Sequence, residues 1–320
     1  MKILVTPTSF NKPQNKEARE VLEAFADEVV YNELARPLTS EELSDRLKDV
    51  DGYIAGLDYI TADALRNANK LKVISRYGTG VDRVDLKTAK EKGIVVTNTP
   101  GTNATAVCEL AFALMLSLAR SIPRLDSAVK RGEWPRNNGI ELKGKTLGII
   151  GFGAIGKNLA VRARAFGMDV IAYDPYFDTA FANANGVKQS TLEEVISTAD
   201  FISLHVPFSE QTAHMINAQR IEKMKDGAFV INTARGGLLD EAAVAQAIRR
   251  GKLGGVGIDA YENEPVTDSP LLGLDNVVMT PHTGAHTDEA TRAMAMMAVE
   301  NLIAVLSGKD CRYIVRAKEE

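Results

Sequence analysis

The sequence predicts an α/β protein built on two doubly wound parallel sheets. Three observations support this fold class. Short apolar runs alternate with helical segments from Lys2 to Val96, a glycine-rich turn begins at Gly151, and strand-like runs then continue to Met279. Repeated β-α units of this length place helices on both faces of a parallel sheet. We expect one domain from residues 1–100 and 286–320 and a second domain from residues 101–285.

Composition excludes several classes of protein. The 320 residues are 45% hydrophobic, which is enough for two cores. The net charge of -4 comes without a basic stripe, so we expect no nucleic acid or anionic membrane as partner. No apolar run approaches the ~18 residues of a membrane span, and the N-terminus looks like a strand rather than a signal peptide. Cys108 and Cys311 are too few and too far apart for a disulfide framework or a metal site, so we expect a cytoplasmic protein with reduced thiols and no metal.

The first domain is predicted to contain five strands, near residues 3–5, 29–31, 53–55, 73–75 and 94–97. Helices are expected between them, near residues 15–26, 40–48, 61–67 and 86–92. Ser40 and Thr61 are the predicted N-caps, because their hydroxyls can accept hydrogen bonds from the first turn of a helix. A last helix over residues 287–306 is long enough to pack back on this domain.

A helix over residues 104–120 is almost wholly apolar, with Glu109 as its one acid. Helices that are apolar all round are buried on all sides, so we expect this one between domains or between subunits. The next helix, residues 123–131, runs into Trp134, the only tryptophan, which we interpret as an interface anchor. The sequence therefore predicts a homodimer formed through residues 103–136.

The second domain is predicted to have six strands, near residues 147–150, 169–172, 201–204, 228–232, 255–258 and 277–279. The turn after the first of them suits a dinucleotide. Gly151 permits a tight turn, Gly153 lets the backbone approach a pyrophosphate, and Gly156 lets the following helix pack on the strand. The free N–H groups at the start of that helix attract phosphate.

Asp174 ends the second strand of this domain, about twenty residues beyond the glycine turn. A carboxylate there accepts hydrogen bonds from the ribose hydroxyls and repels a 2′-phosphate, which favours NAD over NADP. The alternative is a glycine-rich turn with an unrelated surface aspartate. The order of strand, turn, helix, strand and acid favours the NAD site.

Polar residues follow four strands of the second domain, and the carboxyl ends of parallel strands open into one crevice. Arg235 follows the strand at 228–232, and its guanidinium can hold a carboxylate and a neighbouring carbonyl oxygen. The alternative is a surface arginine paired with Glu241. His282 follows the last strand and can take up or return a hydroxyl proton, with Glu264 bound to its other ring nitrogen. Taken alone, a histidine such as His282 is more often a structural residue with its hydrogen bonds satisfied.

Two further features concern ligands. His205, followed by Val206 and Pro207, is interpreted as a wall of the cofactor site, whereas His214 and His286 look peripheral. In the first domain a second glycine-rich loop follows the strand at 73–75. Its free N–H groups suit a substrate carboxylate, although a simple glycine turn remains an alternative. Its sequence is Arg76-Tyr77-Gly78-Thr79-Gly80.

The two glycine-rich loops and the segments that carry Arg235, Glu264 and His282 resemble those of the D-isomer-specific 2-hydroxyacid dehydrogenase family. The resemblance extends over nearly the whole chain and is strongest to the phosphoglycerate dehydrogenase-like branch. The resemblance implies a flavodoxin-like substrate domain beside a Rossmann-like NAD-binding domain. It implies Arg235, Glu264 and His282 as catalytic residues, and Arg136 as a residue that reaches the neighbouring subunit's substrate site. The NAD site is predicted to comprise Gly151, Gly153, Ala154, Ile155, Gly156, Asp174, His205, Val206, Pro207, Thr233, Ala234, Asp259 and Gly284.

Departures from the family pattern concern the substrate. Phosphoglycerate dehydrogenases commonly carry an Arg-Ser pair after the third strand, where this chain has Ala55-Gly56-Leu57-Asp58. Asp58 is expected to add a charge of the wrong sign for phosphate, and Arg76, Lys12 or Arg136 could replace the missing arginine. Because the chain ends at Glu320, we expect no C-terminal domain for feedback by serine.

The resemblance implies an NAD-dependent oxidoreductase that interconverts a D-2-hydroxy acid and its 2-keto acid. D-3-phosphoglycerate is the first candidate substrate. The alternative within the enzyme class is a reductase of hydroxypyruvate, glyoxylate or another 2-keto acid. Outside that class, the fold can serve as an NAD-sensing interaction module, as in the corepressor relatives, but the complete set of Arg235, Glu264 and His282 argues against it.

Overall fold

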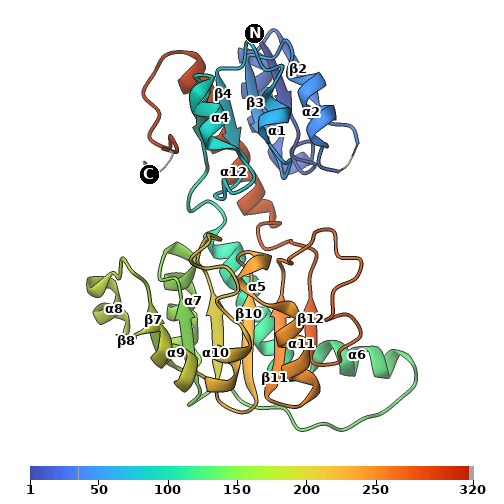
Figure 1. Ribbon diagram of the computed structural model, residues 1–320, viewed down its shortest axis with the longest axis vertical. Helices are drawn as coiled ribbons and strands as arrows, with labels where there is room; N and C mark the ends of the chain where they lie inside the picture. Colours follow the sequence, from blue (N-terminus) through green and yellow to red (C-terminus); the bar gives the residue numbers. More distant parts are fainter. Residues whose placement is uncertain (35, 317–320) are drawn as a thin grey trace. The chain divides into compact units, whose positions relative to one another are not determined.

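The structure is a computed structural model that describes residues 1–34 and 36–316 (Figure 1). The chain divides into two compact units. Unit 1 comprises Met1–Asn103 and His286–Glu320, and unit 2 comprises Ala104–Ala285. Each unit has its own parallel sheet and its own hydrophobic cores.

Unit 1 contains a five-stranded parallel sheet with the order β2-β1-β3-β4-β5. This is the flavodoxin-like strand order, so the predicted fold class of this part is confirmed. The register places Ile3 beside Gly52 on one side and beside Val29 on the other. The strands are β1 (Lys2–Val5), β2 (Glu28–Tyr31), β3 (Gly52–Ala55), β4 (Val73–Arg76) and β5 (Val95–Thr97).

Helices cover both faces of this sheet, and α12 packs on α1, β3 and β4. Thr61 caps α3 as predicted, with its hydroxyl accepting from Ala64 N. The prediction of Ser40 as an N-cap is wrong. Thr39 caps α2 instead, because Glu42 stands three residues later and completes a reciprocal capping box. The helices are η1 (Pro13–Asn15), α1 (Lys16–Phe25), α2 (Ser40–Arg46), α3 (Ala62–Leu65), α4 (Leu86–Glu91) and α12 (Asp288–Leu306).

Unit 2 contains a seven-stranded parallel sheet with the order β12-β11-β10-β9-β6-β7-β8. Counted from β6, this is the doubly wound Rossmann order with one more strand at the edge, and the order reverses between β6 and β9. Six strands were predicted and β8 was missed, because two of its three residues are exposed. The strands are β6 (Thr146–Ile150), β7 (Asp169–Tyr173), β8 (Val187–Gln189), β9 (Phe201–Leu204), β10 (Ala228–Asn232), β11 (Leu253–Ile258) and β12 (Val277–Met279).

One face of this sheet is covered by α5 and α7, and the other by α9, α10 and α11 (Figure 1). The helices of unit 2 are α5 (Ala104–Ala119), α6 (Ile122–Lys130), α7 (Ala154–Ala165), α8 (Thr179–Asn185), α9 (Leu192–Thr198), α10 (Ala218–Lys223), η2 (Gly236–Leu238) and α11 (Glu241–Arg249).

Helix α5 is buried within unit 2 itself, where it packs on α7, β10, β11 and β12. The packing is close, since a Cβ on Gly257 would lie 2.9 Å from the Cβ of Leu114. This packing within unit 2 accounts for its apolar composition, and the expected contact of this helix with a second subunit stays a prediction. Within the described residues, no single helix is long and apolar enough to cross a membrane, although α5 and α6, bent by 63°, pass that test together.

Candidate active site

The glycine loop after β6 has the geometry that a dinucleotide site requires. Gly151 adopts φ +99°, and a Cβ there would lie 2.5 Å from the carbonyl oxygen of His205. A Cβ on Gly156 would lie 2.2 Å from the carbonyl oxygen of Gly151, so the first turn of α7 approaches the strand closely. Gly153 is exposed with open space around it. The N–H groups of Ala154, Ile155 and Gly156 in that first turn can therefore receive an anion.

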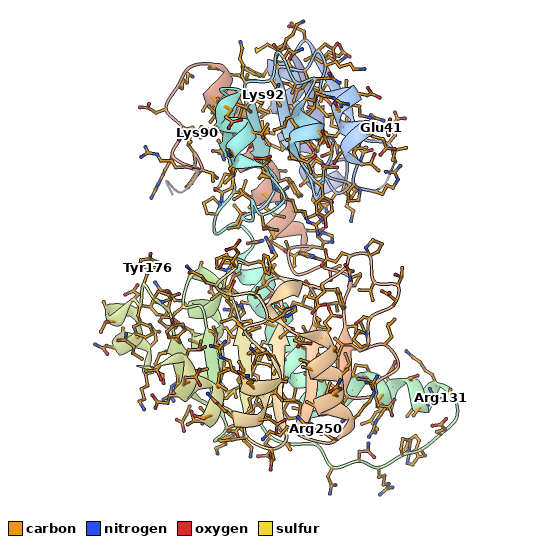
Figure 2. All side chains as sticks on the ribbon, in the orientation of Figure 1. Glu41, Lys90, Lys92, Arg131, Tyr176 and Arg250 are labelled. Atoms are coloured by element: carbon orange, nitrogen blue, oxygen red, sulfur yellow. The ribbon has the colours of Figure 1, made fainter. Side chains whose placement is uncertain are left out.

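Asp174 follows β7 and is joined to the glycine loop by a hydrogen bond. Its Oδ2 accepts from the backbone N–H of Phe152 at 2.7 Å, and its Oδ1 accepts from Tyr176 N at 2.7 Å. The carboxylate therefore fixes the loop as well as presenting a charge beside it. Tyr176 is 93% exposed and projects from unit 2 (Figure 2).

Two polar atoms at neighbouring strand ends have no hydrogen-bond partner among the described residues: His205 Nδ1 and Thr233 Oγ1. The register pairs Leu204 with Asn232. The next residues, His205 and Thr233, therefore lie side by side at the carboxyl ends of β9 and β10. Unsatisfied buried polar atoms are rare in proteins, so a polar ligand at this edge would satisfy them. The loop, Asp174 and these two atoms together fit a bound NAD.

The ring of His205 is held neutral by its surroundings. Its Nε2 lies 2.9 Å from the hydroxyl of Ser203, and its backbone N–H donates to Ile150 O at 2.7 Å. Burial lowers the pKa of His205 to about 3, because the charged ring would lose its hydration. Val206 lies against the glycine loop, where its Cγ1 would be 3.0 Å from a Cβ on Gly151.

His282 and Glu264 come together as predicted. Nδ1 of His282 lies 2.8 Å from Oε1 of Glu264, and that oxygen also accepts from Tyr261 N at 3.2 Å. Both side chains are largely buried, at 27% and 16% exposed. His282 adopts φ +52°, an unusual conformation for a residue other than glycine, of a kind that clusters at functional sites.

Asp259 holds the loop that carries His282. It is 1% exposed, and its carboxylate accepts from Thr280 Oγ1 at 2.6 Å and from the N–H groups of Thr283 and Gly284, both at 2.8 Å. These bonds fix the backbone on both sides of His282. A contact of Asp259 or Gly284 with NAD stays a prediction.

Arg235 follows β10 and lies beside the loop that carries Glu264. Asn232 Nδ2 donates to Arg235 O at 2.7 Å, and Arg235 Nη1 donates to Ala234 O at 2.7 Å. The next residue, Gly236, lies so close to the following loop that a Cβ would be 1.8 Å from the carbonyl atoms of Tyr261. Glu241, the alternative partner considered for Arg235, accepts hydrogen bonds from Glu262 N and Ser269 Oγ.

The second glycine loop, in unit 1, offers fewer free N–H groups than expected. Tyr77 N donates to Ala55 O at 3.0 Å, and Gly78 N donates to Thr99 Oγ1 at 3.0 Å. Among the described residues, the N–H groups of Thr79 and Gly80 are the two in this loop without a partner. A carboxylate site here would therefore depend on these two groups.

Arg76 is turned inward. It is 5% exposed, Nη1 donates to Ala55 O at 2.6 Å and to Gly56 O, and Nε donates to Gly80 O at 3.0 Å. These bonds tie the glycine loop to the end of β3. The guanidinium therefore acts on the loop's shape, and this arrangement argues against the predicted direct contact with a substrate.

The expectation that Asp58 adds a negative charge to the substrate site is wrong. Asp58 is 1% exposed and accepts from the Tyr53 hydroxyl at 2.7 Å, from Leu38 N at 2.6 Å and from Thr6 Oγ1. Burial, with this carboxylate next in importance, raises the pKa of Tyr53 well above its ordinary value. The carboxylate is an internal anchor of unit 1, because the chain after β3 turns this side chain inward.

Arg136 and Trp134 lie in the exposed segment 131–140, and Trp134 is 76% exposed. The contact of Arg136 with the substrate site of a neighbouring subunit stays a prediction. Of the two histidines expected to be peripheral, His214 has its Nε2 3.3 Å from Oε1 of Glu262, and His286 is exposed. Among the described residues, no cluster of three His, Cys, Asp or Glu side chains could hold a metal.

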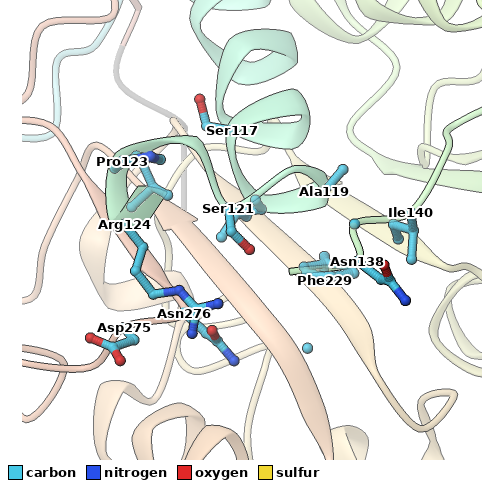
Figure 3. Close-up of a pocket in the computed structure, with 14 residues that line it drawn as sticks. Ser117, Ala119, Ser121, Pro123, Arg124, Asn138, Ile140, Phe229, Asp275 and Asn276 are labelled. Carbon is cyan, nitrogen blue, oxygen red and sulfur yellow. The ribbon is translucent and has the colours of Figure 1, made fainter. Parts of the chain in front are cut away.

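Unit 2 contains a cavity of about 150 Å³, and Figure 3 shows the residues that line it. It is lined by the end of α5, the start of α6, and residues near the amino ends of β10, β11 and β12, including Phe229, Gly254 and Asn276. Ligands of open parallel sheets bind at the carboxyl ends of the strands, which is the opposite edge. The cavity therefore does not belong to the candidate site.

Sequence reasoning missed the residues that support the site. Ser203 and Asn232 were placed only among the polar residues at the strand ends, without a role, and Glu241 was considered only as a partner for Arg235. Asn232, a polar residue that closes an otherwise apolar strand, was the clearest available signal.

Comparison with known proteins agrees with this geometry. Residues 112–284 match the family model of the D-isomer specific 2-hydroxyacid dehydrogenase, NAD binding domain. The chain is 44% identical over 319 residues to a D-3-phosphoglycerate dehydrogenase of Methanocaldococcus jannaschii, covering 98% of this chain but 59% of that protein. It is 45% identical over 302 residues to a hydroxypyruvate reductase of Thermotoga maritima, covering 92% of this chain and 97% of that protein.

Solved structures show the same fold. The TT0316 protein of Thermus thermophilus has 37% identity and a TM-score of 0.88, with 99% of this chain and 100% of that one covered. A D-lactate dehydrogenase of Aquifex aeolicus, complexed with NAD and lactic acid, has 31% identity and a TM-score of 0.82, with 96% of each chain covered. The chain belongs to the D-isomer specific 2-hydroxyacid dehydrogenase family, and unit 2 contains its NAD-binding domain.

Proposed function

We propose that this protein is an NAD-dependent oxidoreductase that interconverts a D-2-hydroxy acid and its 2-keto acid. The observation that carries the proposal is the contact of His282 Nδ1 with Glu264 Oε1 at 2.8 Å, at the carboxyl ends of β12 and β11 in the NAD-binding domain. A histidine held by a carboxylate is suited to exchange a proton with a hydroxyl group, which the oxidation of an alcohol requires.

The site residues have separate roles in this reaction. Bound NAD supplies the hydride acceptor, and the first turn of α7, Asp174 and the strand ends at His205 and Thr233 are the residues that would hold it. His282 Nε2 takes the proton of the substrate hydroxyl, while Glu264 keeps the ring oriented and stabilises the positive charge that results. Arg235 binds the substrate carboxylate through charge-assisted hydrogen bonds, each worth roughly 1.5–3 kcal/mol.

D-3-phosphoglycerate is our first candidate substrate, supported by the similarity to the Methanocaldococcus enzyme. A second candidate is an unphosphorylated 2-keto acid such as hydroxypyruvate or glyoxylate. The inward position of Arg76 favours this second candidate, because a guanidinium that binds Ala55 O, Gly56 O and Gly80 O is not presented to a phosphate.

The proposed reaction and the choice of substrate can both be tested with a panel of 2-hydroxy and 2-keto acids, with turnover measured by NADH absorbance. Turnover of at least one D-2-hydroxy or 2-keto acid is expected, and the ratio of kcat/KM for 3-phosphoglycerate and hydroxypyruvate separates the two candidates. The L-isomers serve as the control. Tight NADH binding without turnover of any acid would instead support an NAD-sensing interaction module.

We further propose that the protein is a homodimer formed through residues 103–136. Three large apolar side chains of this region are exposed in the single chain: Ile122 at 50%, Val129 at 51% and Trp134 at 76%. Large apolar side chains exposed along one segment are candidates for a subunit contact. Light scattering should give twice the mass of 34.6 kDa, and V129D together with W134D should give the monomer. A monomeric wild-type protein would contradict this proposal.

A further inference from the structure

The loop between β11 and β12 determines where the Glu264 carboxylate lies. Residues 259–270 contain neither helix nor strand. The bond from Tyr261 N to Glu264 Oε1 at 3.2 Å joins the side chain to its own loop, and leaves open how the loop is fixed to the rest of unit 2. A site residue on a loop keeps its position only when other contacts hold the backbone.

Glu241 supplies two such contacts. It is the first residue of α11 and is 3% exposed. Its Oε1 accepts from Glu262 N at 2.8 Å, and its Oε2 accepts from Ser269 Oγ at 2.5 Å. Its own N–H donates to Glu262 Oε1 at 3.1 Å. The loop is thus bound to α11 on both sides of Glu264.

Both oxygens of Glu241 act as acceptors, and the N-terminus of α11 stabilises the buried charge. An amide of the same shape can keep both attachments, because its oxygen can accept from Glu262 N while its NH2 group donates to the Ser269 hydroxyl, which is also an acceptor. An alanine has no polar side-chain atom and loses both attachments.

The same loop also rests on Gly236, next to Arg235. A Cβ at Gly236 would lie 1.8 Å from the carbonyl atoms of Tyr261 and 2.4 Å from Glu262 N. The Tyr261–Glu262 peptide is therefore held between Gly236 on one side and Glu241 on the other. Movement of this peptide would displace Glu264, two residues further along.

We propose that Glu241 is a positioning residue: by holding Glu262 N and Ser269 Oγ, it fixes the Glu264 carboxylate against His282. Glu241 acts through the loop, at the backbone N–H of Glu262 and the side-chain hydroxyl of Ser269. The kinetic part of this inference rests on the proposed function. A spectroscopic measurement without substrate or cofactor tests the positioning role separately.

The kinetic test is a double-mutant cycle. Glu241→Ala, which removes both attachments, is expected to lower kcat about 10- to 100-fold, the effect of a small misplacement of a catalytic group, with NADH affinity unchanged. Glu241→Gln, which can keep both attachments, should lose less. In the Glu264→Gln background, Glu241→Ala should change kcat by less than about twofold. Glu289→Ala, at an exposed glutamate in the first turn of α12, is the matched control and should behave as wild type. An equal loss in both backgrounds, or no loss in the wild-type background, would overturn the proposal.

The spectroscopic test uses the protein alone. A ring N–H that donates to a carboxylate gives a proton resonance far downfield, so the Nδ1 proton of His282 should be visible there and disappear in His282→Ala. Glu241→Ala should move this signal upfield, and an unchanged signal would refute the positioning role. If Glu241→Ala does not fold, Ser269→Ala, which removes one attachment, takes its place in both tests with smaller expected changes. A wild type without turnover would refute the proposed function and leave this measurement decisive for Glu241.

Discussion

The imidazole of His282 and the carboxylate of Glu264 meet at 2.8 Å although the residues are 18 positions apart in the chain. They follow the neighbouring parallel strands β12 and β11, whose carboxyl ends share one edge of the sheet. His282 keeps a left-handed backbone at φ +52°, a conformation that costs of order 1–3 kcal/mol and persists where surrounding contacts impose it. Asp259 provides those contacts on both sides of the residue.

Removal of the histidine ring should abolish proton transfer and leave cofactor binding intact. His282→Ala is expected to lower kcat by about 10²–10⁴, the usual contribution of a general acid or base, and Glu264→Gln should lower it by less. NADH affinity should stay at the wild-type value, because neither residue is among those predicted to hold NAD. Steady-state NADH absorbance and NADH fluorescence titration measure the two quantities.

The matched control is Glu222→Gln, which alters an exposed glutamate of α10 that pairs with Arg250. It should leave kcat unchanged. If His282→Ala turns over substrate at nearly the wild-type rate while NADH still binds, His282 is not the proton-transfer residue.

Asp174 is expected to set the preference for NAD. Asp174→Ser removes a negative charge that would repel a 2′-phosphate, and at about 4 Å that repulsion is worth ~1 kcal/mol in water and more in a partly buried site. The ratio of kcat/KM with NADPH to that with NADH should rise at least about fivefold. NADH affinity should also fall, because the bonds to Phe152 N and Tyr176 N are lost.

Asp169→Ser is the control for this change. Asp169 begins the same strand, is exposed, and pairs with Arg164. Its replacement should leave the cofactor ratio unchanged. Should both variants keep the wild-type ratio, Asp174 would have no part in cofactor selection.

The sequence was sufficient to predict where the polar site residues gather. Gly151, Glu264 and His282 each follow an apolar run, and the carboxyl ends of parallel strands converge whatever the details of packing. Local pattern and topology therefore brought these residues to one edge. The helix at 104–120 shows the limit of the same reasoning, because an apolar helix does not reveal which surface covers it.

The direction of a side chain just beyond a strand could not be predicted. Asp58 follows β3 and Arg76 ends β4. Both side chains turn inward: Asp58 accepts from Leu38 N, 20 positions away, and Arg76 donates to Ala55 O, 21 positions away. Glu241 looked like an ordinary first-turn acid, and its partners Glu262 and Ser269 come from a loop 21 and 28 residues away. Such orientations depend on tertiary contacts that no local pattern contains.

A basic group introduced after β3 should favour a phosphorylated substrate, and the structure indicates where it fits. Gly56 is unsuitable, because a Cβ there would lie 3.1 Å from the backbone of Pro7. Leu57 is 38% exposed and offers space for a longer side chain. Leu57→Arg should raise the kcat/KM ratio of 3-phosphoglycerate to hydroxypyruvate at least about tenfold, since a charged hydrogen bond contributes roughly 1.5–3 kcal/mol.

Leu57→Gln is the control, because it is polar without being charged. It should leave the ratio near wild type, and raised salt should reduce the gain seen with Leu57→Arg. An equal change for both acids in Leu57→Arg would show that residue 57 does not face the phosphate.

Acidification should destabilise the protein through His205. The pKa of this histidine falls from its ordinary value of 6.5 to about 3 on folding, because burial disfavours the charged ring. Between these values the unfolded chain binds a proton that the folded protein does not, so stability decreases as the pH falls from about 6.5 towards 3, by up to ~1.4 kcal/mol per pH unit. His205→Asn removes this contribution, and its midpoint of thermal unfolding should fall less than that of the wild type between pH 7 and pH 5. The comparison concerns the slope with pH, since the substitution also alters packing beside Ser203. Parallel pH curves for the two proteins would mean that the ring of His205 is protonated as easily in the folded protein as in the unfolded chain.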